Sequence, residues 1–261
     1  MQRSISLCLS LVVLAFLALS PAAAQQHDLF DQVLRAHVKN GVVDYPAIQE
    51  DPRFQQYIEY LESADPGALL SREEELAFWI NAYNALAIKA VLDGLSTEGF
   101  FSRVRFFTTD LTLAGRQIDL YDLEQDIIIP YGEPRIHFAI VCASASCPKL
   151  ISEAYVADRL DRQLEANARA FVNNPEKNLF DSGRKSAQVS MIFDWFAEDF
   201  EADAKTIQRY LGKYVEDPAI ALALGDDAFE LGYLEYDWSL NGIRPQIEPP
   251  KEEDSMRAND R

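Results

Sequence analysis

The segment from residue 135 to residue 148 constrains this chain more than any other, because it places one histidine and two cysteines within eleven residues. These residues are His137, Cys142 and Cys147, and the one other cysteine, Cys8, lies near the N-terminus. Such a trio suits a local disulfide beside a core histidine, a thiol-imidazole pair or part of a metal site. The chain has to fold around whichever of these it forms.

The N-terminus predicts export. Residues 1–24 contain a positive charge, then an apolar run, then small residues at a cleavage site, which is the pattern of a secretory signal peptide. We expect the mature chain to begin near Gln25, in a periplasmic or extracellular compartment that permits disulfides. Loss of Cys8 with the leader leaves an even pair of cysteines. No later run is long enough to span a membrane, so we expect no membrane insertion after cleavage.

The overall charge restricts the class of partner. The formal net charge is −18, without a stripe of basic residues, which argues against nucleic acid and against anionic membranes as partners. The remaining partners are an unknown small molecule or a peptide, and no residue pattern indicates a cofactor. The oligomeric state is not encoded in any recognisable motif.

Hydrophobic periodicity predicts a single α+β domain over residues 25–241, followed by a flexible charged tail over residues 242–261. The strongest helix covers residues 71–94, where Ser71 begins a capping box. Between residues 77 and 92 this helix is apolar on nearly all sides, so we expect it in the middle of the protein.

Residues 136–142 are the best candidate for a strand, because they are rich in β-branched and aromatic residues. Hairpins are expected over residues 103–120, with a turn at Gly115, and over residues 179–191. The irregular order of strands and helices favours a helix-rich domain around a small, mainly antiparallel sheet. Further helices are expected at residues 28–39, 54–61, 121–128, 154–172, 193–200 and 205–214, and a last strand at residues 229–236.

Alternation along the expected strand distinguishes the two cysteines. It places Cys142 on the face opposite His137, whereas Cys147 lies in the following loop, before Pro148, and can fold back over either face. A neighbouring imidazolium would stabilise the thiolate, and a third group would orient the ring. The sequence therefore predicts Cys147 as nucleophile, His137 as base and Glu124, on a short helix before the strand, as the orienting group.

Three other interpretations of the trio stay open. In an exported protein, Cys142 and Cys147 could close a local disulfide, with His137 a hydrogen-bonded core residue. A cycling thiol-redox pair is less well supported, because the spacing is not C-x-x-C. A zinc site would lack a fourth ligand and any standard spacing, so we expect no metal.

Two asparagines, Asn81 and Asn84, lie in the helix that is expected to be buried. A buried amide without partners costs about 1–3 kcal/mol, so backbone, water or a ligand must satisfy them. They could brace a neighbouring loop, replace Glu124 as orienting group or, together with Trp79, bind or orient a substrate.

Four segments stand out together: residues 77–86, 122–124 with 135–148, 192–196 with 199–200, and 236–241. In combination they resemble the family named domain of unknown function 547, which occurs in bacteria and plants. The resemblance implies a family core over about residues 70–241 and a layout loosely similar to papain-like and transglutaminase-like enzymes. In those enzymes a cysteine opens the central helix, whereas here the helix carries Asn81 and Asn84. Members without a signal keep the Ser-Cys-Pro element, which implies a purpose for the cysteines beyond a disulfide.

Two functions follow. The first is an exported thiol-dependent hydrolase or transferase that uses Cys147 and His137. The second is a non-catalytic binding or envelope-interaction domain with a structural Cys142–Cys147 disulfide. The redox state of the two cysteines distinguishes them, because a nucleophile must be free for part of its cycle.

Overall fold

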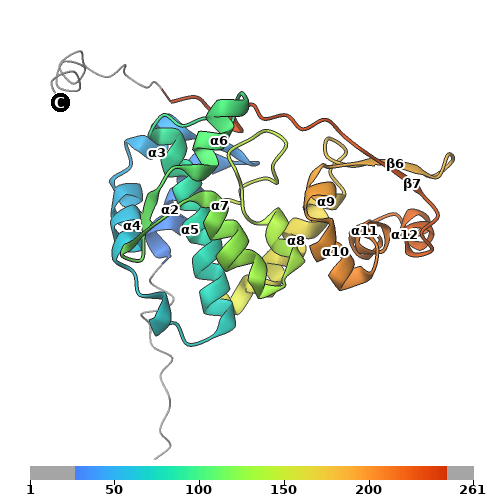
Figure 1. The fold of residues 1–261 in the computed structure, drawn as a ribbon, viewed down its shortest axis with the longest axis horizontal. Coiled ribbons are helices and arrows are strands. Elements are labelled where there is room, and N and C mark those ends of the chain that lie inside the picture. Colours follow the sequence, from blue (N-terminus) through green and yellow to red (C-terminus); the bar gives the residue numbers. More distant parts are fainter. Residues whose placement is uncertain (1–26, 246–261) are drawn as a thin grey trace, which may run out of the picture.

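The computed structural model describes residues 27–245. The expected signal peptide, Cys8 and most of the expected tail lie outside the described residues. Within them the chain forms many helices and three small sheets, which confirms the helix-rich α+β class (Figure 1). In this part of the chain no helix is long and apolar enough to cross a membrane.

The helices surround α5, and most of them are short. The α-helices are α2 (Asp28–His37), α3 (Tyr45–Gln49), α4 (Pro52–Ser63), α5 (Arg72–Leu92), α6 (Phe100–Thr108), α7 (Leu120–Asp122), α8 (Leu160–Val172), α9 (Ile192–Trp195), α10 (Ala197–Ala204), α11 (Ile207–Tyr214) and α12 (Pro218–Gly225). Shorter or irregular turns are η1 (Pro66–Ala68), η2 (Leu123–Ile128), η3 (Ile129–Tyr131), η4 (Pro134–Phe138) and η5 (Ala157–Arg159).

The sheets have two or three strands each and mix antiparallel with parallel pairing. Their orders are β1 (Val38–Lys39), β2 (Val42–Asp44), β8 (Gly242–Ile243); β3 (Leu111–Leu113), β4 (Arg116–Ile118); and β5 (Leu179–Asp181), β6 (Ser186–Val189), β7 (Glu230–Tyr233). Strand β8 pairs with β2, so regular structure continues two residues past the expected domain end at residue 241.

The central helix α5 has the capped start and the burial that its sequence predicts. The Ser71 hydroxyl accepts a hydrogen bond from the Glu74 amide at 3.1 Å, and the Glu74 carboxylate accepts one from the Leu70 amide at 2.7 Å. Nearly all side chains from Leu76 to Val91 are buried. Because α5 contacts neighbours on all sides, it forms the axis of the larger of two hydrophobic clusters.

The second hydrophobic cluster lies between α8, β6 and α9 to α11, and its centre is a group of phenylalanines from distant segments. Phe138, Phe193 and Phe200 have ring centroids 5.0 to 5.7 Å apart. In Figure 1 this cluster lies to the right of α5, and the chain after β7 returns along the upper edge toward β2. The segment around His137 therefore lies at the junction of the two clusters.

The prediction of a strand at residues 136–142 is wrong. Pro134 opens the short turn η4, the Glu133 carboxylate caps it, and the chain beyond Phe138 is irregular. All residues from Ile136 to Val141 are buried, so the segment has no solvent-exposed face. The alternation of residue types along it therefore does not indicate which way each side chain points. Residues 103–108 are also helical, within α6, although the hairpin at Gly115 is confirmed.

Candidate functional site

Side-chain amides, rather than a neighbouring strand, hold the chain that follows His137. Asn84 on α5 donates to the Ala139 carbonyl at 2.9 Å and accepts from the Val141 amide at 2.8 Å. Asn167 on α8 donates to the Phe138 carbonyl at 3.2 Å. These bonds satisfy buried backbone groups without a sheet, which explains how an irregular segment can lie in the interior without a partner strand.

Asn81 fixes a second segment in the same way. Its side chain donates to the Tyr155 carbonyl at 2.8 Å and accepts from the Tyr155 amide at 2.9 Å. The donating nitrogen and the oxygen of both α5 asparagines are thus engaged with backbone. Asn84 thus orients the segment that carries His137 through hydrogen bonds to its main chain.

Cys142 and Cys147 form a disulfide, with their Cα atoms 6.4 Å apart. The bond closes the small loop between them, and the C-terminal segment holds this loop from outside. The Ala145 amide donates to the Ser239 carbonyl at 2.7 Å, and the Asn241 amide donates to the Ala143 carbonyl at 3.0 Å. In this state Cys147 is not a free thiol.

The two sulfurs do not have the same surroundings. Three donors lie near Cys147 Sγ: the Cys142 amide at 3.1 Å, the Tyr236 hydroxyl at 3.2 Å and the Ser144 hydroxyl at 3.4 Å. Cys142 Sγ lies near the same two hydroxyls, at 3.1 Å from Ser144 and 3.6 Å from Tyr236, and no backbone amide bonds to it. Burial raises the pKa of Tyr236, so its hydroxyl keeps its proton as a donor.

His137 is 2% exposed and bonded at one nitrogen only. Its Nε2 lies 2.8 Å from Oδ2 of Asp199 on α10, and its ring stacks on Phe196 with centroids 3.9 Å apart. Burial lowers the pKa of His137 below its ordinary value, more than the hydrogen bond to Asp199 raises it. The neutral ring therefore donates from Nε2, which leaves the Nδ1 lone pair as an acceptor.

The acceptor at His137 Nδ1 has no partner. Among residues 27–245, this atom and the Tyr210 hydroxyl are the buried side-chain nitrogen or oxygen atoms without a hydrogen bond. Buried polar atoms are nearly always satisfied, so an unpartnered one beside a cavity indicates a place for a ligand donor. Cys147 Sγ does not fill this place, and the expected thiol-imidazole bond is not formed.

Glu124 lies on η2 and points its carboxylate at Tyr83, whose hydroxyl donates to Oε2 at 3.4 Å. Burial raises the pKa of Glu124 to about 7, and the Tyr83 hydroxyl lowers it by less. The carboxylate bonded to His137 is that of Asp199, not that of Glu124. Glu124 is instead a separate acid-base group that titrates near neutral pH.

These groups share one cavity of about 420 Å³, called here the aromatic cavity. It brings together Glu124, His137, Cys142 and Cys147, whereas Asn81 and Asn84 do not line it. Trp79 lines a different cavity of about 390 Å³ beside Tyr131. The remaining walls are Tyr83, Phe107, Tyr121, Gln125, Ile140, Pro148, Ile192, Trp195, Phe196, Tyr236 and Trp238.

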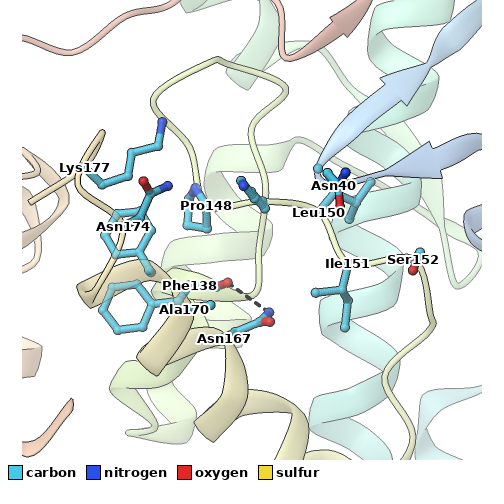
Figure 2. A pocket seen from close by; sticks show the side chains of 13 residues that line it. Asn40, Phe138, Pro148, Leu150, Ile151, Ser152, Asn167, Ala170, Asn174 and Lys177 are labelled. Carbon is cyan, nitrogen blue, oxygen red and sulfur yellow. Dashed lines mark hydrogen bonds between the residues drawn. The ribbon is translucent and has the colours of Figure 1, made fainter. Parts of the chain in front are cut away.

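A second cavity, of about 490 Å³, shares Pro148 with the first and is called here the amide cavity. Figure 2 shows that Asn167 points toward Phe138 in its wall, with Asn174 and Lys177 on one side. Lys177 donates to the Ala145 carbonyl, and Asn174 Oδ1 accepts from the Glu176 amide at 3.0 Å. In contrast to His137, these side chains have protein partners.

Across residues 27–245, no group of three or more His, Cys, Asp or Glu side chains is arranged so that it could hold a metal ion. His137, Cys142 and Cys147 therefore do not form a cluster of the kind considered for zinc.

Sequence reasoning did not find Asp199, Ser144 or Tyr236 as site residues. Asp199 is 62 residues from His137, and Tyr236 is 89 residues from Cys147. Both lie in segments that carry the family resemblance, and that is the one signal that could have identified them. Only the folded chain brings Tyr236 into the cavity wall and Asp199 to the His137 ring.

Residues 68–172 of the chain match the family described as "Protein of unknown function, DUF547". The match includes Glu124, His137 and both cysteines, whereas Asp199 and Tyr236 lie beyond it. Neither the curated proteins nor the solved structures contain a match to the chain. The expected likeness to papain-like and transglutaminase-like enzymes therefore stays a prediction.

Proposed function

We propose that this protein is a binding domain whose ligand is a small, flat, largely apolar molecule held in the aromatic cavity. The observation that carries the proposal is the unpartnered Nδ1 of His137, a buried acceptor in the cavity wall. A ligand N–H or O–H would satisfy this atom, and Asp199 fixes the tautomer that makes it an acceptor.

The cavity walls support a flat apolar ligand. Trp195, Tyr236 and Trp238 have ring centroids 4.4 to 5.6 Å apart and form an aromatic wall. A volume of about 420 Å³ lies in the range of small-molecule sites, which bury apolar walls with a few polar groups. Such a ligand agrees better with the walls than an extended peptide does. Glu124, with a pKa of about 7, would donate to the ligand below neutral pH and accept above it.

We also propose that the protein is exported to a periplasmic or extracellular compartment. A leader of the secretory type at residues 1–24 and a disulfide that closes the loop over the cavity both suit an oxidising environment. The acidic composition favours a neutral or cationic ligand over a polyanion, and nucleic acid is not proposed as a partner. After cleavage of the leader we propose no insertion into a membrane.

Binding of indole tests the role of His137, because indole is flat and carries one N–H donor. We expect indole to shift the ¹⁵N resonance of His137 Nδ1, and 1-methylindole, which lacks the donor, to bind about 3- to 10-fold more weakly. The readout is a titration followed by NMR on the protein labelled in histidine. Equal affinity for both compounds, or no response at His137, would contradict the proposal.

A second candidate function is the thiol-dependent hydrolase or transferase. It is favoured by one observation, that Cys147, His137 and Glu124 all line the same cavity. It requires the disulfide to be reduced and the Cys147 thiol to approach His137 Nδ1. After reduction, iodoacetamide should then label the native protein quickly near neutral pH; Cys147→Ser should abolish the fast labelling, and Cys142→Ser should leave it largely intact. Equal, ordinary labelling rates in both variants would reject the nucleophile.

A further inference from the structure

We propose that the Cys142–Cys147 disulfide is a thiol-disulfide exchange site in which an external thiolate attacks Cys142 and Cys147 leaves as the stabilised thiolate. This inference goes beyond ligand binding and does not depend on it. It rests on the different surroundings of the two sulfurs in the aromatic cavity.

The first difference is access. Cys147 is 5% exposed and belongs to the buried core, whereas Cys142 is partly exposed. Both residues line a cavity of about 420 Å³, which is large enough to admit a small thiol. An incoming thiolate therefore meets Cys142 with less obstruction, and access to each sulfur decides which one is attacked.

The second difference is stabilisation of the leaving sulfur. The Cys142 amide points to Cys147 Sγ at 3.1 Å, and the Tyr236 hydroxyl lies nearer to Cys147 Sγ than to Cys142 Sγ, at 3.2 Å against 3.6 Å. Hydrogen bonds to an anion are stronger than those to a neutral sulfur, so these donors favour a thiolate on Cys147. A leaving thiol with a lower pKa departs faster in exchange.

Ser144 does not reverse this preference. Its hydroxyl lies 3.1 Å from Cys142 Sγ and 3.4 Å from Cys147 Sγ. It has a single proton for these two sulfurs and the Tyr236 oxygen, at 3.1 Å. The backbone amide of Cys142 is the donor that cannot turn away from Cys147.

The exchange requires neither a metal nor a protein-bound oxidant. The sulfur of an external thiolate forms a bond to Cys142 Sγ, the bond between Cys142 and Cys147 breaks, and its electron pair leaves on Cys147 Sγ. A second external thiolate then releases Cys142 as a thiolate, so two external thiols become one disulfide while the protein pair is reduced by two electrons. The co-reactant is a thiol, either small or carried by another protein.

Reaction of the oxidised, native full chain with reduced glutathione tests the direction of attack. Under acid quench, tandem mass spectrometry should place the glutathione on Cys142 and leave Cys147 as the free thiol. Glutathione on Cys147, equal amounts on both residues, or no reaction of the native protein would overturn the proposal. The experiment contains no cavity ligand, so its failure leaves the binding function untouched, and failure of indole binding leaves exchange untouched.

Tyr236→Phe tests the stabilising donor. Removing one hydrogen bond to a thiolate should slow the exchange about tenfold and raise the pKa of the Cys147 thiol, measured by alkylation against pH in the Cys142→Ser background. The matched control is Tyr233→Phe, an exposed tyrosine on β7 outside the cavity. An unchanged rate and an unchanged thiol pKa in Tyr236→Phe, or the same change in both variants, would overturn the role of Tyr236.

Discussion

The aromatic cavity and the amide cavity share Pro148, and consecutive residues of one segment line them: His137 the first and Phe138 the second. The amide cavity is the larger, at about 490 Å³ against about 420 Å³. Its Asn167, Asn174 and Lys177 side chains bond to protein groups, whereas the aromatic cavity contains an unpartnered imidazole nitrogen and a disulfide. The unpartnered nitrogen and the disulfide, rather than the cavity volume, therefore identify the candidate site.

The largest expected effect concerns Asn84, which braces the buried backbone that follows His137. Asn84→Ala would leave the buried Ala139 carbonyl and Val141 amide without partners, so we expect the free energy of unfolding to fall by about 3 kcal/mol. Urea denaturation measures this loss. Asn174→Ala, in the wall of the amide cavity, removes one exposed hydrogen bond to the Glu176 amide and should cost less than about 1 kcal/mol. Equal losses would show that Asn84 stabilises the fold no more than Asn174 does.

A comparable effect, limited to neutral and higher pH, concerns the raised pKa of Glu124, about 7. The folded state keeps the proton more tightly than the unfolded chain, so this group's stabilisation is complete below the unfolded pKa of about 4.5 and is lost as the pH rises through 7. Glu124→Gln should therefore match the native stability near pH 4.5 and exceed it by about 3 kcal/mol at pH 8.

Thermal or urea unfolding at several pH values measures this difference. The control is Glu176→Gln, an exposed glutamate beside Lys177 at the amide cavity, which should change stability by less than about 0.5 kcal/mol at every pH. A pH-independent effect of Glu124→Gln would mean that Glu124 is not desolvated in the folded state.

The smallest expected effect tests whether the two cavities communicate through the disulfide loop. Lys177 in the amide cavity donates to the Ala145 carbonyl in the loop that the disulfide closes. Lys177→Met should cost about 1 kcal/mol in stability and increase amide hydrogen exchange in residues 143–146, without changing indole affinity. A change in indole affinity would show that the amide cavity controls the aromatic one.

Local patterns predicted the elements whose geometry depends on near neighbours. The capping box at Ser71 and the apolar surface of the following helix predicted α5, and the turn at Gly115, with φ of +73°, predicted its hairpin. Residues 136–142 were assigned wrongly because β-branched and aromatic residues are also typical of any fully buried segment. Nothing local shows that Asn84 and Asn167, rather than a strand, satisfy this backbone.

The predicted placement of Cys142 relative to His137 depended on the same strand. The strand expected at residues 136–142 separated Cys142 from His137, but both line the aromatic cavity, because an irregular chain does not alternate its side chains between two faces. The disulfide alternative, in contrast, needed only two cysteines five residues apart in a chain with an export signal, and the structure contains that bond.

The sequence by itself determined the helix-rich class, the axis helix α5 and the possibility of a Cys142–Cys147 disulfide, and it predicted Glu124, His137 and the cysteines as candidate site residues. These features depend on interactions within about 25 residues, which periodicity and spacing record. The partner of His137 and the donors around Cys147 were decided only by the tertiary structure. Asp199 reaches the His137 ring through packing of the second hydrophobic cluster, and Tyr236 reaches the cavity through the return of the C-terminal segment. Such long-range contacts leave no periodic trace in a single sequence.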